Sequence, residues 1–344
     1  MASLRDIAAE CQLSINAVSE ILNRGNEARY RPETCERVRA VASRLNYVPN
    51  RAAQSMRSRR SRVVGFVTEN TSSNREAIYH PSIYSFVVGL SHAMIDAGHH
   101  LAVLDLFELA PSGDPQSRVL EEVFFDGLIV HQGRHGSQDE LERRVDVPVV
   151  WYDAQIDGPV RQVRRDELQV GRELVEHLYA LGHRQIAFAM PGYAPDAVPA
   201  GVSFNFSMRD RVAGYHAAMH ALGLQPIMIP TLGAADLGAT LRARNITALI
   251  TEGTSEFASV VMAANLVGMQ VPRDLSWAAC DVDDRRDYGG LQLGGMRYDR
   301  YAAGQQAAAM LLRLIAARED EPPTVKMPGV FQPGDTVIRV TPSA

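Results

Sequence analysis

Residues 4–23, LRDIAAECQLSINAVSEILN, predict two short helices joined by a tight turn. The first helix carries apolar residues at helical spacing on one face: Leu4, Ile7, Ala8 and Cys11. Ser14 is a suitable N-cap for the second helix, whose inward-facing residues are Val18, Ile21 and Leu22. This spacing is typical of a helix-turn-helix.

A third helix is expected to complete the core, because two helices this short are marginal on their own. Pro32 supplies a first-turn residue. Apolar residues then follow at i, i+3, i+4 and i+7: Val38, Val41, Ala42 and Leu45. We therefore predict a three-helix headpiece over residues 1–48.

The solvent face of the second helix carries side chains that can read DNA. Asn16 and Glu20 share a face, with Ile15 and Ser19 beside them. In the major groove an asparagine can pair with adenine, a glutamate can accept from cytosine and an isoleucine can touch a thymine methyl. Ser19 can reach a phosphate; the alternative is that all four are ordinary solvated positions. The predicted DNA contacts of the headpiece are Ser14, Ile15, Asn16, Ser19, Glu20, Asn23 and Arg24.

The distribution of charge favours contact with DNA. Residues 1–62 contain twelve arginines and six acidic residues, a net charge of +6, whereas the whole chain carries −5 at pH 7. The remaining residues therefore carry −11. An arginine-rich head on an acidic body is expected when one end of a chain meets phosphate.

Length and composition limit the protein class. The 344 residues are too many for one compact core and suit a headpiece with one or two α/β units. With 46% hydrophobic residues, no signal peptide and no run of 18 apolar residues, we expect a cytoplasmic protein without membrane contact. Three widely spaced cysteines without a CxxC pair argue against disulfides and cysteine zinc sites.

Residues 49–61 predict a hinge between the headpiece and the rest of the chain. Pro49 ends the third helix, and Asn50 can cap a new short one. One interpretation is a flexible tether. The other is a helix, RAAQSM, that pushes Met56 into a minor-groove step as an apolar wedge while arginines hold phosphates. The predicted DNA contacts of the hinge are Asn50, Gln54, Met56 and Arg57.

The segments DIAAECQLSINAVSEILN, YVPNRAAQSM and VVGFV resemble, in order and spacing, the lac repressor (LacI) family of bacterial transcription regulators. The resemblance implies a headpiece, a hinge helix that orders on operator DNA and an effector-binding body. Three positions depart from the usual family pattern: Glu20 and Gln54 stand where arginine is common, and Met56 where leucine is usual. The operator bases are therefore not carried over from relatives.

The body, residues 62–344, alternates strands with helices. Strands are expected at 63–67, 101–106, 127–130, 147–152, 186–190, 226–229, 248–251 and 276–280. Helices are expected at 80–97, 117–124, 165–181, 209–222 and 301–318. Sustained alternation predicts parallel sheets, which place ligands at the carboxyl ends of their strands.

Further segments of the body resemble the same family, among them VPVVWYD, RDRVAGYHAAM and VPRDLSWAACD. The resemblance then covers nearly the whole chain. It implies a type I periplasmic-binding-protein-like fold, in which two Rossmann-like subdomains are joined by three crossovers and hold a small molecule between them. It also implies a homodimer, with the helix after His80 and the segment after Asp281 at its surface.

The resemblance also suggests effector-binding residues. Arg211 matches a position that grips effector hydroxyls or carboxylates, and a guanidinium suits a sugar or an acid; the alternative is an arginine on a helix surface. Asp281 matches a carboxylate that accepts from a ligand hydroxyl, and its alternative is a turn or cap residue. Further expected pocket residues are Ser82, Ile83 and Asp166.

The sequence shows no catalytic constellation. The motifs GxSxG, HExxH, GxxxxGK[ST] and GxGxxG are absent. His131 and His135 are four residues apart, but Gly133 and Gly136 indicate a loop, and a metal site would need further ligands. We therefore expect no catalytic residue, no metal and no cofactor.

The expected function is transcriptional repression by a homodimer on a pseudo-palindromic double-stranded operator. A small-molecule effector, a sugar or related metabolite, is expected to control it allosterically. The C-terminal sequence has no leucine heptad, which favours dimers over tetramers. Two other classes stay open: a periplasmic ligand receptor, which needs a signal peptide but no arginine-rich headpiece, and a DNA-binding enzyme, which needs catalytic residues.

Overall fold

The computed structural model describes most of the chain, in two compact units, Met1–Ser61 and Arg62–Ala344. We call these units the headpiece and the body. The described residues are 2–23, 27–48, 60–70, 81–107, 125–131, 141, 145–154, 156, 160–190, 206–230, 233–282, 290–316 and 324–340.

The described part of the headpiece contains three α-helices, α1 (Leu4–Cys11), α2 (Ile15–Asn23) and α3 (Pro32–Arg44), and a short 3-10 turn, η1 (Glu27–Arg29). The hydroxyl of Ser14 caps α2 by accepting a hydrogen bond from the backbone N–H of Ala17 at 3.1 Å. Between α1 and α2, Gln12 adopts a left-handed conformation with φ 53°, which makes the turn tight. The predicted helix-turn-helix and its third helix are confirmed.

Apolar residues from all of these helices form the headpiece core. Ile7, Val18, Ile21 and Val38 are at most 2% exposed and belong to one cluster. Burying one such side chain contributes about 1.5–3 kcal/mol, so a few of them hold the short helices together. Cys11 and Cys35 are buried in the same core and form no disulfide.

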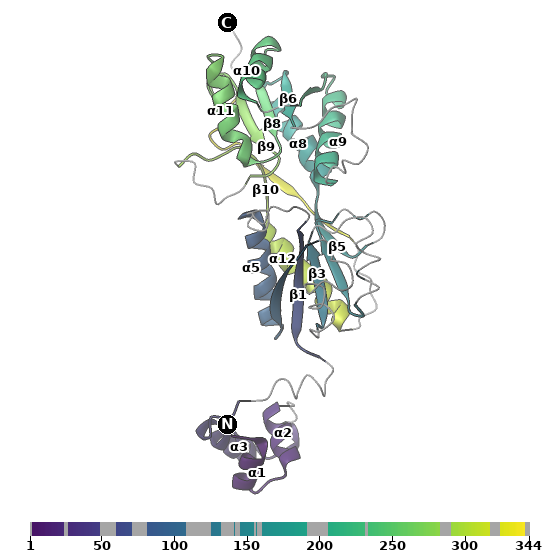
Figure 1. The fold of residues 1–344 in the computed structure, drawn as a ribbon, viewed down its shortest axis with the longest axis vertical. Helices are drawn as coiled ribbons and strands as arrows, with labels where there is room; N and C mark the ends of the chain where they lie inside the picture. The colour runs from purple at the N-terminus through teal and green to yellow at the C-terminus, as the bar shows by residue number, and fades with distance from the viewer. Residues whose placement is uncertain are drawn as a thin grey trace. The chain divides into compact units, whose positions relative to one another are not determined.

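The first sheet of the body has the order β11-β5-β4-β3-β1-β2, and its described pairs are all parallel. Helices α5 (Pro81–Asp96) and α12 (Arg300–Ile315) pack together against it (Figure 1). A Cβ atom on Gly304 would lie 2.2 Å from the carbonyl oxygen of Phe86, so glycine permits this close approach. The strands are β1 (Val63–Asn70), β2 (His100–Phe107), β3 (Gly127–His131), β4 (Val149–Tyr152), β5 (Gln162–Arg165) and β11 (Val325–Met327).

The second sheet has the order β12-β10-β9-β8-β6-β7. One of its faces packs on α8 (Glu167–Ala180) and α9 (Phe206–Ala221), and the other on α10 (Ala234–Ala243) and α11 (Phe257–Leu266). Alternate strand residues point to opposite faces: Phe188 joins the α8–α9 core and Ala187 the α10–α11 core. The strands are β6 (Ile186–Ala189), β7 (Ile227–Ile229), β8 (Ala248–Thr251), β9 (Ser276–Ala279), β10 (Gly295–Tyr298) and β12 (Gly329–Gln332).

Within the described chain the backbone passes three times between the two sheets. The first crossover joins β5 to α8, the second joins β10 to α12, and the third joins β11 to β12. In Figure 1, β10 runs from the upper sheet toward the lower one. Two α/β subdomains joined in this way confirm the predicted architecture of the body.

The second sheet departs from the expectation of parallel pairing at one edge, because β12 pairs antiparallel with β10. Strands β5, β10, β11 and β12 were not predicted, and the expected helix 165–181 begins only at Glu167 because Arg165 ends β5. The expected helix 117–124 lies outside the described residues. Among the described helices, none combines the length and the apolar character needed to cross a membrane.

Candidate functional site

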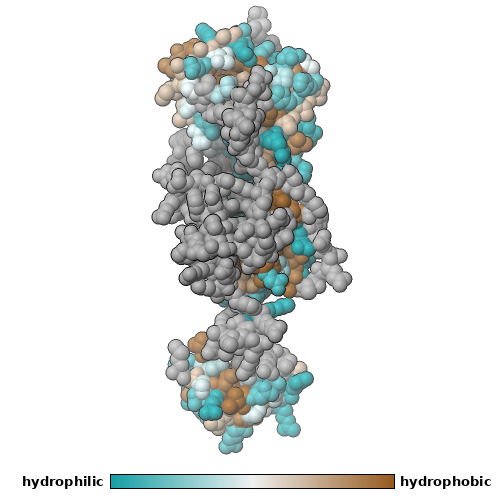
Figure 2. Space-filling view, turned by 45° about the vertical axis from the view of Figure 1, so that its right-hand side comes forward, coloured by the Kyte–Doolittle hydropathy of each residue, from teal (hydrophilic) through white to brown (hydrophobic). Residues whose placement is uncertain are grey.

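The exposed side of α2 carries part of the predicted DNA-binding face. Ser14 and Asn16 are exposed, and the side chain of Ile15 is 45% exposed. Glu20 is half-buried and accepts a 2.7 Å hydrogen bond from the hydroxyl of Tyr30 and a longer one from the side-chain amide of Asn16. Hydrophobic and hydrophilic residues both reach the described headpiece surface (Figure 2).

Ser19 differs from the sequence prediction, which placed it beside Asn16 on the solvent face. Its exposure is only 5%. Helix α2 packs against both α1 and α3, so its buried face is wider than the stripe marked by Val18 and Ile21 and takes in the neighbouring serine. Ser19 therefore lies on the buried face of α2, and its contact with a phosphate stays a prediction.

Arg24 and the hinge residues Asn50, Gln54, Met56 and Arg57 lie outside the described residues. The backbone of Asn23 ends α2, but its side chain also lies outside them.

In the body, charged side chains gather where the carboxyl ends of the strands from both subdomains meet. Asp153 follows β4, Arg165 ends β5, Glu252 follows β8, and Asp281 comes shortly after β9. Helices and the second crossover contribute the remaining members. We call this group the charge cluster; it comprises Asp153, Arg165, Glu167, Arg211, Glu252, Asp281, Tyr298 and Arg300.

Arg165 is the centre of the charge cluster. Its guanidinium lies 2.8 Å from Asp153, 3.0 Å from Glu167 and 2.9 Å from Asp281. Asp153 is held in place by the backbone N–H of Arg165 and adopts a left-handed backbone conformation with φ 49°. Non-glycine residues with this backbone conformation often mark functional sites.

Arg211 and Glu167 form a buried bidentate pair. Nε and Nη2 of Arg211 donate to the two carboxylate oxygens of Glu167 at 2.7 and 2.8 Å, and the side chains are 3% and 0% exposed. The hydroxyl of Tyr298 also donates to Glu167 at 2.8 Å. Burial alone would lower the pKa of Arg211, but the carboxylate of Glu167 raises it above the usual value of arginine.

The close packing of α8 against α9 brings this pair together. A Cβ atom on Gly171 would lie 2.0 Å from the carbonyl oxygen of Arg211, and one on Gly214 would lie 2.2 Å from the carbonyl oxygen of Leu168. Glycine at both positions lets the two backbones approach until the first turn of α8 faces Arg211.

Asp281 joins the second subdomain to two crossovers. Its Oδ2 accepts hydrogen bonds from Arg165 and from Nη2 of Arg300. Burial alone would raise the pKa of Asp281, but Arg300 and Arg165 hold it well below its usual range. Its Oδ1 is buried and has no hydrogen-bond partner among the described residues.

The other predicted effector residues have local roles. Asp166 caps α8 by accepting from the backbone N–H of Gln169, and Nζ of Lys326 lies 3.8 Å from it. Ile83 is half-buried against the core of the first sheet, and the side chain of Ser82 lies outside the described residues. The structure thus brings Arg211 and Asp281 into one cluster but places Ile83 in apolar packing.

Most members of the charge cluster were missed by sequence reasoning. Arg165 and Glu167 read as the start of a helix, and Arg300 as the residue before one. For Asp153 and Glu252 a signal was available, because they directly follow the expected strands 147–152 and 248–251, where parallel sheets collect polar residues. His131 ends β3 and stacks on Tyr152; His135 lies outside the described residues, which contain no group of three possible metal ligands.

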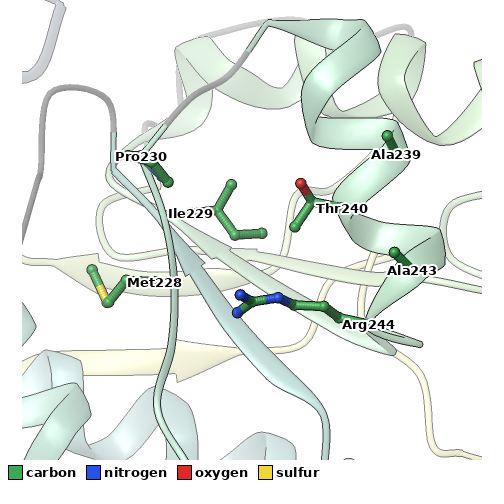
Figure 3. Close-up of a pocket in the computed structure, with 7 residues that line it drawn as sticks. All are labelled: Met228, Ile229, Pro230, Ala239, Thr240, Ala243 and Arg244. Atoms are coloured by element: carbon green, nitrogen blue, oxygen red, sulfur yellow. The ribbon is translucent and has the colours of Figure 1, made fainter.

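A separate pocket lies in the second subdomain between β7 and α10 (Figure 3). The side chain of Arg244 extends from the end of α10 toward Met228 and Ile229 of β7. None of the predicted effector residues lines it. Its lining residues are Met228, Ile229, Pro230, Ala239, Thr240, Ala243 and Arg244.

Comparison with known proteins finds similarity to a periplasmic binding protein-like domain and to bacterial regulators. A periplasmic binding protein-like domain matches residues 175–337. The maltose regulon regulatory protein MalI of Escherichia coli (strain K12) is 27% identical over 64% of this chain and 60% of its own length. This chain thus spans about three fifths of the length of that relative.

Other similarities extend over almost the whole chain. The HTH-type transcriptional regulator CelR of Thermobifida fusca is 24% identical over 93% of this chain and 94% of its own length. A crystal structure of the lac repressor dimer bound to operator and the anti-inducer ONPF superposes with a TM-score of 0.74 and 22% identity, covering 98% of this chain and 99% of that chain. The second similarity shows that the folds agree.

Proposed function

We propose that the chain is a member of the lac repressor (LacI) family and acts as a sequence-specific DNA-binding transcriptional regulator, a repressor. A small-molecule effector bound between the two subdomains of the body controls its affinity for operator DNA. The protein acts on DNA in the bacterial cytoplasm and performs no catalysis.

The observation that carries this proposal is the bonding of Asp281 to two crossovers. Arg165 stands at the first crossover and Arg300 at the second, and both bond the same carboxylate of the second subdomain. A ligand that contacts Asp281 changes its hydrogen bonds to these two crossovers, which connect the subdomains. A ligand shifts such an equilibrium only by its differential affinity for the two states.

Asn16, Ile15 and Ser14 are the headpiece residues that we propose to contact DNA directly, because α2 presents them to solvent. Glu20 takes part through the same face, with its carboxylate oriented by Tyr30. The hinge over residues 49–61 adds contacts from Asn50, Gln54, Met56 and Arg57.

The DNA-binding form is a homodimer on a pseudo-palindromic operator. Large apolar side chains on the first subdomain support this: Tyr84 and Ile95 of α5 and Val103 of β2 are 58–64% exposed. A surface of this kind suits contact with a second copy.

The effector is a sugar or related metabolite, and Arg211 and Asp281 are the residues proposed to respond to it. Fold neighbours with 20% and 17% identity include a CelR–cellobiose complex and a LacI-family regulator with bound ribose. A suitable first panel is therefore cellobiose and ribose, with maltose, lactose and sucrose, the sugars that name related regulators.

Removing residues 1–61 tests the proposal. The fragment 62–344 is one of the two compact units, and it should lose binding to the DNA upstream of its own coding sequence while keeping the thermal stabilisation that a panel sugar gives the full chain. DNA binding that survives in the fragment would contradict the assignment of the headpiece.

A further inference from the structure

We propose that Glu167 sets the charge preference of the effector site: by occupying Arg211, it makes the site select an uncharged ligand that donates hydrogen bonds and reject carboxylates and phosphates. This inference rests on the proposed function only in taking the charge cluster as the effector site. It concerns a residue that the sequence did not single out.

The charge balance of the cluster is the first support. Among the described residues it contains three arginines, Arg165, Arg211 and Arg300. Four carboxylates face them, those of Asp153, Glu167, Glu252 and Asp281. Among the described members, the carboxylates thus outnumber the arginines. A bound anion would therefore add a buried charge without a free cation to balance it.

The hydrogen bonds of Arg211 are the second support. Nε and Nη2 donate to Glu167, and Nη1 lies 3.3 Å from the carbonyl oxygen and 3.5 Å from Oε1 of Glu252. Each guanidinium nitrogen thus already faces an oxygen of the chain. A carboxylate that takes both Nε and Nη2 of Arg211 must displace Glu167, which is 0% exposed and also bonded to Tyr298 and Arg165.

The unpaired oxygen of Asp281 is the third support. A buried carboxylate oxygen without a donor is costly, and Oδ1 has none among the described residues. A ligand hydroxyl donates a hydrogen bond to this atom, whereas an ionised carboxylate has only acceptors to offer and repels it. The cluster therefore lacks a donor and already has enough acceptors.

The substitution Glu167→Gln in the full-length chain removes the negative charge of this side chain but keeps its size. The readout is thermal unfolding followed by tryptophan fluorescence, with inorganic phosphate as the probe and sodium chloride at matched ionic strength. In E167Q, Arg211 loses its carboxylate partner. About 10 mM phosphate should therefore raise the Tm by about 2 °C or more above the Tm in sodium chloride of the same ionic strength. The unsubstituted chain should show no such difference.

Matched variants control for other sites of phosphate binding. E173Q makes the same change on α8 at a partly exposed residue paired with Arg172, and it should respond like the unsubstituted chain. The double variant E167Q/R211Q should lose the phosphate response, and E167D, which keeps the carboxylate, should not gain it. An effect of phosphate on the arginine-rich headpiece would be equal in every variant.

The outcomes decide the proposal. A phosphate response confined to E167Q supports it; saturable phosphate binding by the unsubstituted chain that R211Q abolishes, or an unresponsive folded E167Q, overturns it. If E167Q does not fold, phosphate binding by the unsubstituted chain and by R211Q is compared instead. Saturable binding that R211Q abolishes overturns the proposal, and the absence of such binding supports it. Neither readout involves DNA, so failure to bind any operator would refute the proposed function without affecting this result.

Discussion

Nη1 of Arg165 lies 2.9 Å from Oδ2 of Asp281, 116 residues further along the chain. The contact joins the end of β5 in one subdomain to the segment after β9 in the other. Because β5 leads directly into the first crossover, the same hydrogen bond ties this crossover to the segment that follows the carboxyl end of β9. Movement between the subdomains must stretch or break it.

Replacing Asp281 by asparagine should weaken the body. The change leaves Arg165 and Arg300 without a shared anion, and removing one partner of a buried ion pair costs about 3–5 kcal/mol. Urea unfolding followed by the fluorescence of Trp151 in β4 and Trp277 in β9 reports on each sheet. D96N, at the exposed end of α5, is the control and should change stability by less than about 0.5 kcal/mol. Equal stability of D281N and D96N would refute the role of Asp281 as a link.

Gly171→Ala should separate α8 from α9. A Cβ atom there would lie 2.0 Å from the carbonyl oxygen of Arg211, so the helices must shift, at a cost of about 1–3 kcal/mol. Gly253→Ala is a matched control, because its Cβ would lie no nearer than 3.6 Å to its neighbours. Chemical denaturation of both variants measures the difference, and a G171A variant as stable as G253A would show that the approach is not tight.

Stability should fall as the pH drops from about 7 to 5, in part because of His183. Burial lowers the pKa of His183, whose ring nitrogens lie 3.0 Å from the hydroxyl of Thr247 and the carbonyl oxygen of Ile338. The unfolded chain therefore binds the proton more readily, and stability is lost as the pH falls below the unfolded pKa of about 6.5. H183Q should show a flatter dependence in the same titration; an identical slope would assign the pH dependence to other groups.

Asn16→Ala should relax base preference at one operator position by about 1–3 kcal/mol, because a side chain that reads a base edge carries sequence information. Binding to a set of operators mutated one base pair at a time measures it. Ser19→Ala should leave these preferences unchanged, since Ser19 is buried in the headpiece. A uniform loss of affinity in N16A across all sequences would instead assign Asn16 to the phosphate backbone.

Local patterns predicted the headpiece well because its core is built from residues close in sequence. Ile7, Val18 and Val38 follow helical periodicity, and they are all fully buried. Strand β5 escaped prediction because its sequence, QVRR, ends in two arginines and has no apolar run. Its place in the sheet comes from pairing with β4 and with β11, whose paired residues lie 162 positions further along the chain.

The candidate site was predicted only in part for the same physical reason. Arg211 and Asp281 came from resemblance to a family, but their partners depend on contacts between distant segments. Glu167 and Arg211 are separated by 44 residues, and no local pattern indicates that a carboxylate at the start of α8 occupies this arginine. The pairing of Arg211 with Glu167 depends on the packing of α8 on α9.

The most direct test of the account is a titration of the full-length chain onto labelled DNA from upstream of its own coding sequence, with and without the sugar panel. We expect tight, salt-sensitive binding to one pseudo-palindromic site, changed by about 5-fold or more by at least one sugar. D281N should bind the same site with a reduced response to that sugar. Equal affinity for this DNA and for unrelated duplexes, unaffected by every sugar, would contradict the account.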